Sequence, residues 1–421
     1  MSDLVNRDLA TIWHPYTQMK TAARPIPIIR GEGVYLFTED GKRLIDAVSS
    51  WWVNIHGHSH PYIAAQVFEQ LKTLEHVIFA GFTHPQAVKL AENLLSIIPK
   101  NQAKIFYSDN GSTAIEVAIK MCLQFWSNKG EDRQKIVAFK NAYHGDTFGA
   151  MAVSGRSAFT APFESLLFDV EFIDLPNKDN VEEIKTQLSN LKAELACFIF
   201  EPLVQGAGGM LMYEATYLDE LILHCKNEQI LTIADEVMTG FGRTGKNFAS
   251  DYLVNKADLM CFSKGLTGGT MPLGITSCKQ EIYDAFLSED KLKTLFHGHS
   301  FTANPVACAA ANASFDLLML PETQNNIKRV EAKHHAFKLE INGHQRLKEI
   351  RQTGTILALE WETEGTSYFN NIRDVLYNFF LDKGIILRPL GNILYIMPPY
   401  CIINDDLDYI YAQIKEALNK F

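Results

Sequence analysis

The sequence predicts an α/β protein: a large domain with a mainly parallel sheet flanked by helices, joined to a smaller α+β domain. Between residues 60 and 300, short β-rich apolar runs alternate with segments of helical periodicity. This alternation is typical of parallel strands linked by crossover helices. Beyond residue 320 the pattern becomes a mixed order of helices and strands. A chain of 421 residues has room for two or three domains.

The individual elements follow from local patterns. Residues 1–30 are expected to be irregular, because aromatic residues and prolines interrupt them. An Asp-Gly turn at Asp40-Gly41 between two apolar runs predicts a β-hairpin over residues 33–47. In the large domain we expect helices over residues 61–74, 85–98, 113–126 and 217–227, and strands over residues 104–107, 136–139, 170–173, 196–200, 230–234 and 259–262.

The C-terminal part begins with a long apolar helix from Pro305 to about Leu320. Helices are then expected near residues 327–342, near 368–383 and from 405 onward, with strands near 347–361 and 385–397. We divide the chain into an N-terminal segment (1–55) that joins the small domain, a large cofactor-binding domain (56–310) and a C-terminal small domain (311–421).

Composition excludes several classes of protein. The formal charge of −10 argues against a nucleic-acid-binding surface. No stretch has the roughly 18 consecutive apolar residues of a membrane-spanning helix, and the first residues lack the pattern of a secretory signal. The seven cysteines are scattered, odd in number and without a CxxC pair. They indicate reduced thiols and a cytoplasmic protein.

The most informative single residue is Lys264, which follows the apolar run Leu259–Phe262 on a Gly-rich loop. Taken alone, it reads most simply as a surface lysine after a strand. A lysine in an apolar setting, however, loses its proton more readily and becomes a nucleophile. The residues around the other strand ends favour this second reading.

Three of these strand ends carry further chemistry. Asp235 ends the apolar run Ile230–Ala234 and could keep a bound heterocycle protonated, or could simply cap a helix. Gly111 and Ser112 stand between a strand and a helix, where free N–H groups bind phosphate well. Tyr143 follows another strand and could stack on a flat ring. Together with Lys264 they indicate an aldehyde-bearing pyridine phosphate held as a Schiff base.

At this point the sequence resembles the class III, fold-type I pyridoxal-phosphate aminotransferases, over nearly the whole chain. Two features are similar to the signature of that family: the sequence of residues 234–245, ADEVMTGFGRTG, and the lysine that follows it at Lys264. The resemblance implies that Lys264 forms the link to pyridoxal 5'-phosphate and moves the proton. It also implies that Asp235 pairs with the pyridine nitrogen, that Gly111 and Ser112 hold the phosphate, and that Tyr143 covers the ring.

Three stretches resemble one branch of this family, the aminotransferases of biotin synthesis: residues 13–17, residues 50–52, and residues 388–391 with 395–400. This implies S-adenosylmethionine as amino donor and 8-amino-7-oxononanoate as acceptor, by a ping-pong transfer. Tyr16, Trp51 and Trp52 would line the substrate pocket, with one tryptophan of the pair packed in the core. Arg388 would take a substrate carboxylate.

The resemblance also implies a homodimer with shared active sites. Gly298-His299-Ser300 is similar to a segment that crosses to the neighbouring subunit's cofactor phosphate and substrate. Some relatives carry Pro-Thr where this chain has His299-Ser300. Ser300 retains the hydroxyl of that threonine and is assigned its role, whereas the resemblance implies no definite role for His299. Such a shared site requires an oligomer, most simply a two-fold dimer.

Other functions fit less well. Another class III transaminase, of the ornithine or 4-aminobutyrate type, is the main alternative, but many such relatives have an acidic residue where this chain has Ala207. Residues 240–245 match GxGxxG without the strand and helix of a nicotinamide site. The histidines at 56, 58, 60, 297 and 299 lack the spacing of a complete zinc site. No metal is therefore expected.

Overall fold

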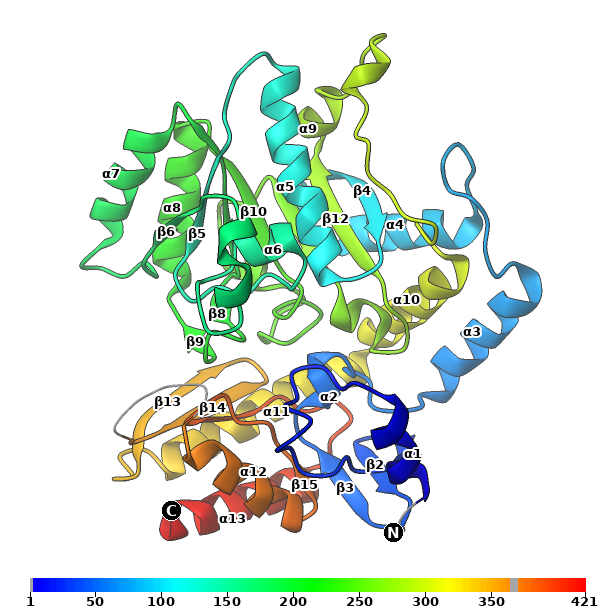
Figure 1. Cartoon of the computed structure of the whole chain (residues 1–421), viewed down its shortest axis with the longest axis vertical. Coiled ribbons are helices and arrows are strands. Elements are labelled where there is room, and N and C mark those ends of the chain that lie inside the picture. The colour runs from blue at the N-terminus through cyan, green and yellow to red at the C-terminus, as the bar shows by residue number, and fades with distance from the viewer. Residues whose placement is uncertain (1–2, 364–369) are drawn as a thin grey trace.

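A computed structural model describes residues 3–363 and 370–421 of the chain (Figure 1). Its centre is a seven-stranded sheet in the order β4-β12-β11-β10-β7-β5-β6. Only β12 runs antiparallel to its neighbours. The strands are β4 (Gln102–Ser108), β12 (Gly274–Lys279), β11 (Leu259–Phe262), β10 (Leu231–Asp235), β7 (Leu195–Phe200), β5 (Lys135–Phe139) and β6 (Glu171–Ile173).

Helices cover both faces of this sheet, as the alternating pattern predicts. On β7, Cys197 and Ile199 pack in the core beneath α5, whereas Phe198 and Phe200 face the opposite core beneath α4 and α8. The helices of this part are α3 (Pro61–Thr73), α4 (Pro85–Ile97), α5 (Gly111–Asn128), α6 (Phe148–Ala152), α7 (Val181–Leu191), α8 (Ala215–Asn227), α9 (Gln280–Asp284) and α10 (Pro305–Leu318). Shorter elements are η1 (Ala161–Leu166), β8 (Val204–Gln205), β9 (Leu211–Met212), η2 (Ala249–Tyr252), η3 (Lys264–Thr267) and η4 (Lys291–Lys293).

The remaining elements join the two ends of the chain. In Figure 1 the blue N-terminal strands lie beside the orange and red C-terminal elements, below the large sheet. A four-stranded sheet in the order β1-β2-β3-β15 makes this connection, since β15 pairs with β3. The elements are α1 (Asp3–Thr11), β1 (Ile28–Glu32), β2 (Tyr35–Thr38), β3 (Arg43–Asp46), α2 (Ser49–Trp52), α11 (Pro321–Glu340), β13 (Leu347–Thr353), β14 (Ile356–Trp361), α12 (Ile372–Asp382), β15 (Ile385–Ile386), β16 (Ile393–Ile396) and α13 (Asn404–Lys420).

Two expectations about local structure need correction. Residues 1–30 are not irregular throughout, because they contain helix α1 and strand β1. The patterns were weak: α1 is mostly polar, with Val5 its one buried residue, and β1 is almost wholly exposed. The helix expected near residues 368–383 starts partly outside the described residues, and its described part is α12.

Antiparallel β12 was not anticipated, since its sequence GITSCK mixes apolar with small polar residues. Its Thr276 and Ser277 are nevertheless buried, because their hydroxyls bond to Ala114 O (2.7 Å) and Gln102 Oε1 (2.7 Å). In residues 3–363 and 370–421, no helix is both long enough and apolar enough to cross a membrane.

The carboxyl ends of β4, β5, β10 and β11 meet at one edge of the large sheet, because these strands run in the same direction. In open α/β sheets this edge is where ligands bind. Of the sequence-predicted residues, Asp235 is the last residue of β10, and Gly111, Tyr143 and Lys264 follow the ends of β4, β5 and β11.

Candidate active site

Lys264 lies at the first position of η3, directly beyond β11. Its backbone adopts a positive φ of 49°, which is uncommon for a residue with a side chain. The ammonium nitrogen lies 4.9 Å from the centre of the Trp52 ring. Burial lowers the pKa of Lys264, while the carboxylates of Asp235 and Glu201 act in the opposite direction. The lysine is therefore positioned to lose its proton, as a nucleophile or base must.

Asp235 is buried and held in a fixed orientation. Its Oδ2 lies 2.7 Å from Nδ1 of His144, and its Oδ1 accepts a hydrogen bond from the Val237 N–H at 3.0 Å. The other ring nitrogen of His144, Nε2, is buried and has no hydrogen-bond partner among the described residues. His144 was quoted in the sequence only as a neighbour of Tyr143. Its contact with Asp235 depends on two loops meeting, which no local pattern reveals.

Glu201 is a further site residue that sequence reasoning did not assign. It is buried, and its carboxylate accepts hydrogen bonds from the N–H groups of Tyr143 (3.0 Å) and Gly206 (2.9 Å). Burial raises the pKa of Glu201 to about 7; nearby His144 lowers it and Asp235 raises it. Glu201 thereby fixes the loop that carries Tyr143 next to the β7 loop.

At the predicted phosphate-binding residues, Gly111 and Ser112, two loops approach each other closely. A Cβ added to Gly145 would lie 2.1 Å from Oγ of Ser112, and one added to Gly111 would lie 2.8 Å from Cγ1 of Val237. Neither position has room for a side chain. Asn110 caps α5 by accepting from the Thr113 N–H at 3.0 Å. The first N–H groups of a helix have no partner within the helix, so they can bind an anion.

Tyr143 contacts Tyr16 at the same edge of the large sheet. Their hydroxyl oxygens lie 3.4 Å apart, and Tyr16 also donates a short hydrogen bond to Asp146. Burial raises the pKa of Tyr143, and the hydrogen bond with Tyr16 and the charge of Asp146 add to the effect. Tyr16 comes from the N-terminal segment, so residues far apart in the sequence form this cluster.

The two tryptophans have different environments. Trp52 is buried, and its Nε1 donates to the Tyr395 hydroxyl at 3.0 Å, so one of the pair does pack in the core as predicted. Trp51 is 44% exposed, and its ring centre lies 5.5 Å from that of Tyr16. The guanidinium carbon of Arg388 lies 5.1 Å from the Trp51 ring. Arg388 is exposed, so its fork is accessible to a ligand carboxylate.

Arg243 is a buried cation that sequence reasoning quoted only as part of a motif. It is 1% exposed and donates to the carbonyl oxygens of Pro398 (2.8 Å) and Trp52 (3.2 Å). Burial lowers the pKa of Arg243, while Tyr400 and Asp46 raise it. Among the described residues no carboxylate lies within ion-pair distance of it. It anchors the tryptophan turn to the C-terminal part of the chain.

Gly298, His299 and Ser300 are not brought to this cluster within the chain. They lie on the loop between η4 and α10, with Ser300 exposed. In the described part of the chain, their hydrogen bonds stay within the loop, from the His299 N–H to Thr302 Oγ1 (3.0 Å) and from the Phe301 N–H to His299 Nδ1 (3.2 Å). A role at an active site therefore requires a second copy.

The clustered histidines serve other contacts. Nε2 of His56 lies 3.0 Å from the carbonyl oxygen of Ser314, and Nε2 of His58 lies 2.8 Å from Asp46. Over residues 3–363 and 370–421, no group of three or more His, Cys, Asp or Glu side chains is arranged to hold a metal ion.

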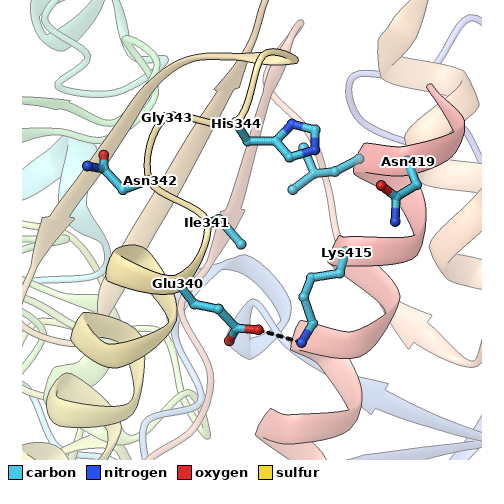
Figure 2. A pocket seen from close by; sticks show the side chains of 8 residues that line it. Glu340, Ile341, Asn342, Gly343, His344, Lys415 and Asn419 are labelled. Carbon is cyan, nitrogen blue, oxygen red and sulfur yellow. Dashed lines mark hydrogen bonds and ion pairs between the residues drawn. The ribbon is translucent and has the colours of Figure 1, made fainter.

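A separate surface pocket of about 290 Å³ lies between the end of α11 and α13 (Figure 2). A Glu340–Lys415 ion pair (2.7 Å) spans it, and its other lining residues are Ile341, Asn342, Gly343, His344, Leu418 and Asn419. None of the candidate site residues lines this pocket.

With this geometry established, comparisons with known proteins decide the family. The model of the family "Aminotransferase class-III" matches residues 16–418. The chain belongs to the class III aminotransferases. This membership confirms the resemblance, the enzyme class and the cofactor, pyridoxal phosphate, that the sequence indicates.

Individual relatives agree along the full length of the chain. An adenosylmethionine-8-amino-7-oxononanoate aminotransferase of Synechococcus elongatus is 45% identical over 419 residues, 97% of this chain and 98% of the relative. The crystal structure of the enzyme of that name from Methanocaldococcus jannaschii is 34% identical, with a TM-score of 0.94 and 99% and 98% of the two chains covered. An amine transaminase from an uncultivated Pseudomonas species, solved in its PLP-bound form, is 29% identical with a TM-score of 0.91, covering 97% and 98%. The expected fold class is thereby confirmed.

Proposed function

We propose that this aminotransferase acts in biotin synthesis. It transfers the amino group of S-adenosylmethionine to 8-amino-7-oxononanoate and so makes 7,8-diaminononanoate. The observation that carries the proposal is the cluster of Tyr16, Trp51 and Arg388 at the mouth of the site that contains Lys264. Aromatic faces attract a sulfonium cation, and the arginine fork suits a carboxylate. Full-length relatives of that name support the same assignment.

The cofactor would be held by the residues that end the strands. Gly111 and Ser112 would bind its phosphate through the N-terminus of α5, where the close approach of Gly145 leaves room for no side chain. Asp235, paired with His144, would hold the proton of the pyridine nitrogen. Tyr143 would cover the ring.

When bound, pyridoxal phosphate supplies an electron sink that makes the proton beside a substrate amine removable. Lys264 would take that proton and return it, since burial favours its neutral amine. Lys264, Asp235 and Tyr143 are thus the proposed catalytic residues. Trp52 would keep water from the amine, because its ring lies against Lys264. The donor and acceptor would use the same pocket in turn, in a ping-pong order.

The proposed substrate-binding residues are Tyr16, Trp51, Trp52, Tyr143, Lys264 and Arg388, with Gly298 from a second copy. His299 and Ser300 of that copy would complete the phosphate site, so the active enzyme would be a homodimer. Consistent with this, the described hydrogen bonds of residues 298–300 are to Phe301 and Thr302 of the same loop. Its proposed location is the cytoplasm. We also propose that residues 1–55 and 311–421 form one domain and residues 56–310 the other, because β3 pairs with β15.

The direct test is to incubate the purified holoenzyme with adenosylmethionine and 8-amino-7-oxononanoate and to measure the diamine. Lysine, ornithine and 4-aminobutyrate serve as alternative donors in parallel reactions. Formation of the diamine with adenosylmethionine supports the proposal. Turnover of ornithine or 4-aminobutyrate with no diamine would assign the protein to another branch of class III.

A further inference from the structure

The turn that carries the two tryptophans has an unusual backbone. Three of its residues with side chains adopt positive φ angles: Ser49 (52°), Ser50 (58°, with ψ −91°) and Trp52 (68°). Each such residue is strained, and the conformation persists only where surrounding contacts impose it. Something in the fold must therefore hold this turn.

The buried carboxylate of Asp46 makes three of these contacts, all at the start of the turn. Its Oδ1 accepts from the Val48 N–H (3.2 Å), and its Oδ2 accepts from the Ser50 N–H (2.6 Å) and from the Ser50 hydroxyl (3.1 Å). Nε2 of His58 lies 2.8 Å from the same Oδ2. The Asp46 side chain has no exposed surface. One carboxylate thus binds the amino-terminal half of the strained segment, while the Trp52 end is held by Arg243 and Tyr395.

The turn links the two sides of the candidate active site. Trp52 lies against Lys264, on the side where the chemistry would occur. Its neighbour Trp51 lies against Arg388 and Tyr16, where a substrate would enter. A relaxed turn would move both rings, since they are consecutive residues.

We propose that Asp46 is a positioning residue for substrate binding. Its carboxylate, oriented by His58, holds the strained turn so that Trp51 and Trp52 line the path between Arg388 and Lys264. This inference rests on the proposed function for its substrates. It assigns no role in the chemistry to Asp46, which touches neither Lys264 nor Asp235 in the hydrogen bonds of the described residues.

The main variant is Asp46→Asn in the holoenzyme. The amide keeps the shape but loses the charge, and it places a donor against at least one N–H or hydroxyl of the turn. We expect the KM for the amino donor to rise roughly tenfold, the effect of losing one hydrogen bond to a charged group. The kcat and the visible absorbance of the bound cofactor should change much less, because Lys264 and Asp235 are untouched.

A second substitution separates positioning from general stability. Glycine adopts positive φ at little cost, so Ser50→Gly should relieve the strain that Asp46 otherwise holds. In the double variant Asp46→Asn/Ser50→Gly, the KM for the amino donor should return most of the way to the wild-type value. His58→Gln removes a single contact and should give a smaller rise. It also serves as the test if Asp46→Asn does not fold.

Asp258→Asn is the matched control. Asp258 also bonds to backbone and hydroxyl groups of one residue, Thr232 (2.8 Å to each), but at the amino end of β10, away from the site. It should lower stability without changing KM. Hydrogen exchange of residues 46–58 gives a readout that needs no turnover, and it should speed up in Asp46→Asn and not in Asp258→Asn.

The outcomes are distinct. A raised KM with faster exchange, both reversed by Ser50→Gly, supports the proposal. An unchanged KM in Asp46→Asn, or equal effects in Asp258→Asn, overturns it. If wild-type protein shows no activity with any donor, the proposed function fails, while the exchange data still decide whether Asp46 holds the turn.

Discussion

The reactivity of Lys264 depends on its surroundings. Burial lowers the pKa of Lys264 and favours the neutral amine, whereas the carboxylates of Asp235 and Glu201 favour the ammonium and oppose this shift. Such a balance is what a group needs in order to give and take a proton. The strand end and the signature motif identify this residue from sequence, but only the folded chain reveals the second carboxylate.

Arg388 should bind the carboxylate of the acceptor. Arg388→Ala should raise the KM for 8-amino-7-oxononanoate about tenfold or more, because a hydrogen bond to a charged group contributes about 1.5 to 3 kcal/mol. Arg388→Lys should give an intermediate value, since lysine lacks the planar fork. Steady-state kinetics measure the effect. Arg346→Ala is the control: Arg346 bonds to the terminal carbonyl of Phe421 (2.6 Å), far from the tryptophan turn. A wild-type KM in Arg388→Ala would contradict the role.

Glu201 should make stability depend on pH. Its folded pKa of about 7 lies above the ordinary value of 4.5, so the folded protein binds a proton that the unfolded chain releases. Its contribution is therefore complete below about pH 4.5, falls as the pH rises, and is lost above about pH 7, by about 3 kcal/mol at most. Glu201→Gln should remove this part of the slope.

Urea unfolding of wild type and Glu201→Gln across that pH range measures the difference. Glu164→Gln, a change of an exposed acid on η1, should leave the wild-type slope intact. If the curves of wild type and Glu201→Gln run parallel, the carboxyl titrates in the folded protein as it does in the unfolded chain, and the assignment fails.

Among the elements, α5 would connect the fold to the cofactor most directly, because its N-terminus is the proposed phosphate site. Asn110→Ala should remove the cap and cost about 1 kcal/mol of stability. It should also weaken cofactor binding, since the first N–H groups would lose their fixed direction.

Titration of the apoprotein with pyridoxal phosphate measures this second effect. Asn180→Ala removes comparable asparagine contacts at the start of α7, namely bonds with the Asn177 N–H (2.8 Å) and the Leu175 carbonyl (3.0 Å). It should lower stability alone. Equal cofactor affinity in both variants would show that the α5 cap does not shape the phosphate site.

Elements with a clear local signal could be predicted from sequence. Strand β11 matches the expected residues, and α3 and α4 begin at the prolines that mark them. Antiparallel β12 could not, because its buried hydroxyls depend on partners from other elements. The tryptophan turn was identified by the family resemblance, whereas its strained backbone depends on Asp46 and on the C-terminal part of the chain.

At the scale of the whole molecule, the proposed shared active site requires two copies of the chain. The sedimentation mass of the active enzyme should be twice the 47.4 kDa of the chain. Ser300→Ala should weaken cofactor binding, because its hydroxyl would serve the neighbouring site. Ser288→Ala changes a serine that accepts from the Asp290 N–H (3.0 Å) outside this segment, and it should not. A fully active monomer would rule out a shared site.

The fold also brings both ends of the chain to the proposed substrate pocket. Tyr16 and Trp51 come from the first 55 residues, Arg388 comes from the last part, and Lys264 comes from the large sheet between them. Local sequence patterns indicate each of these residues separately, and the family resemblance implies that they line one pocket. The contacts of Arg243 arise only where these distant segments pack together, whereas those of His144 and Glu201 join loops and strand ends at one edge of the large sheet.

The central claim is that Lys264 is the amine that carries the chemistry. The most direct measurement compares wild type, Lys264→Ala and the control Lys279→Ala, which removes the partner of Asp258, for visible cofactor absorbance and for amino transfer. We expect Lys264→Ala to lose the wild-type absorbance and all measurable transfer, while Lys279→Ala keeps both. Amino transfer at the wild-type rate by Lys264→Ala would contradict the account.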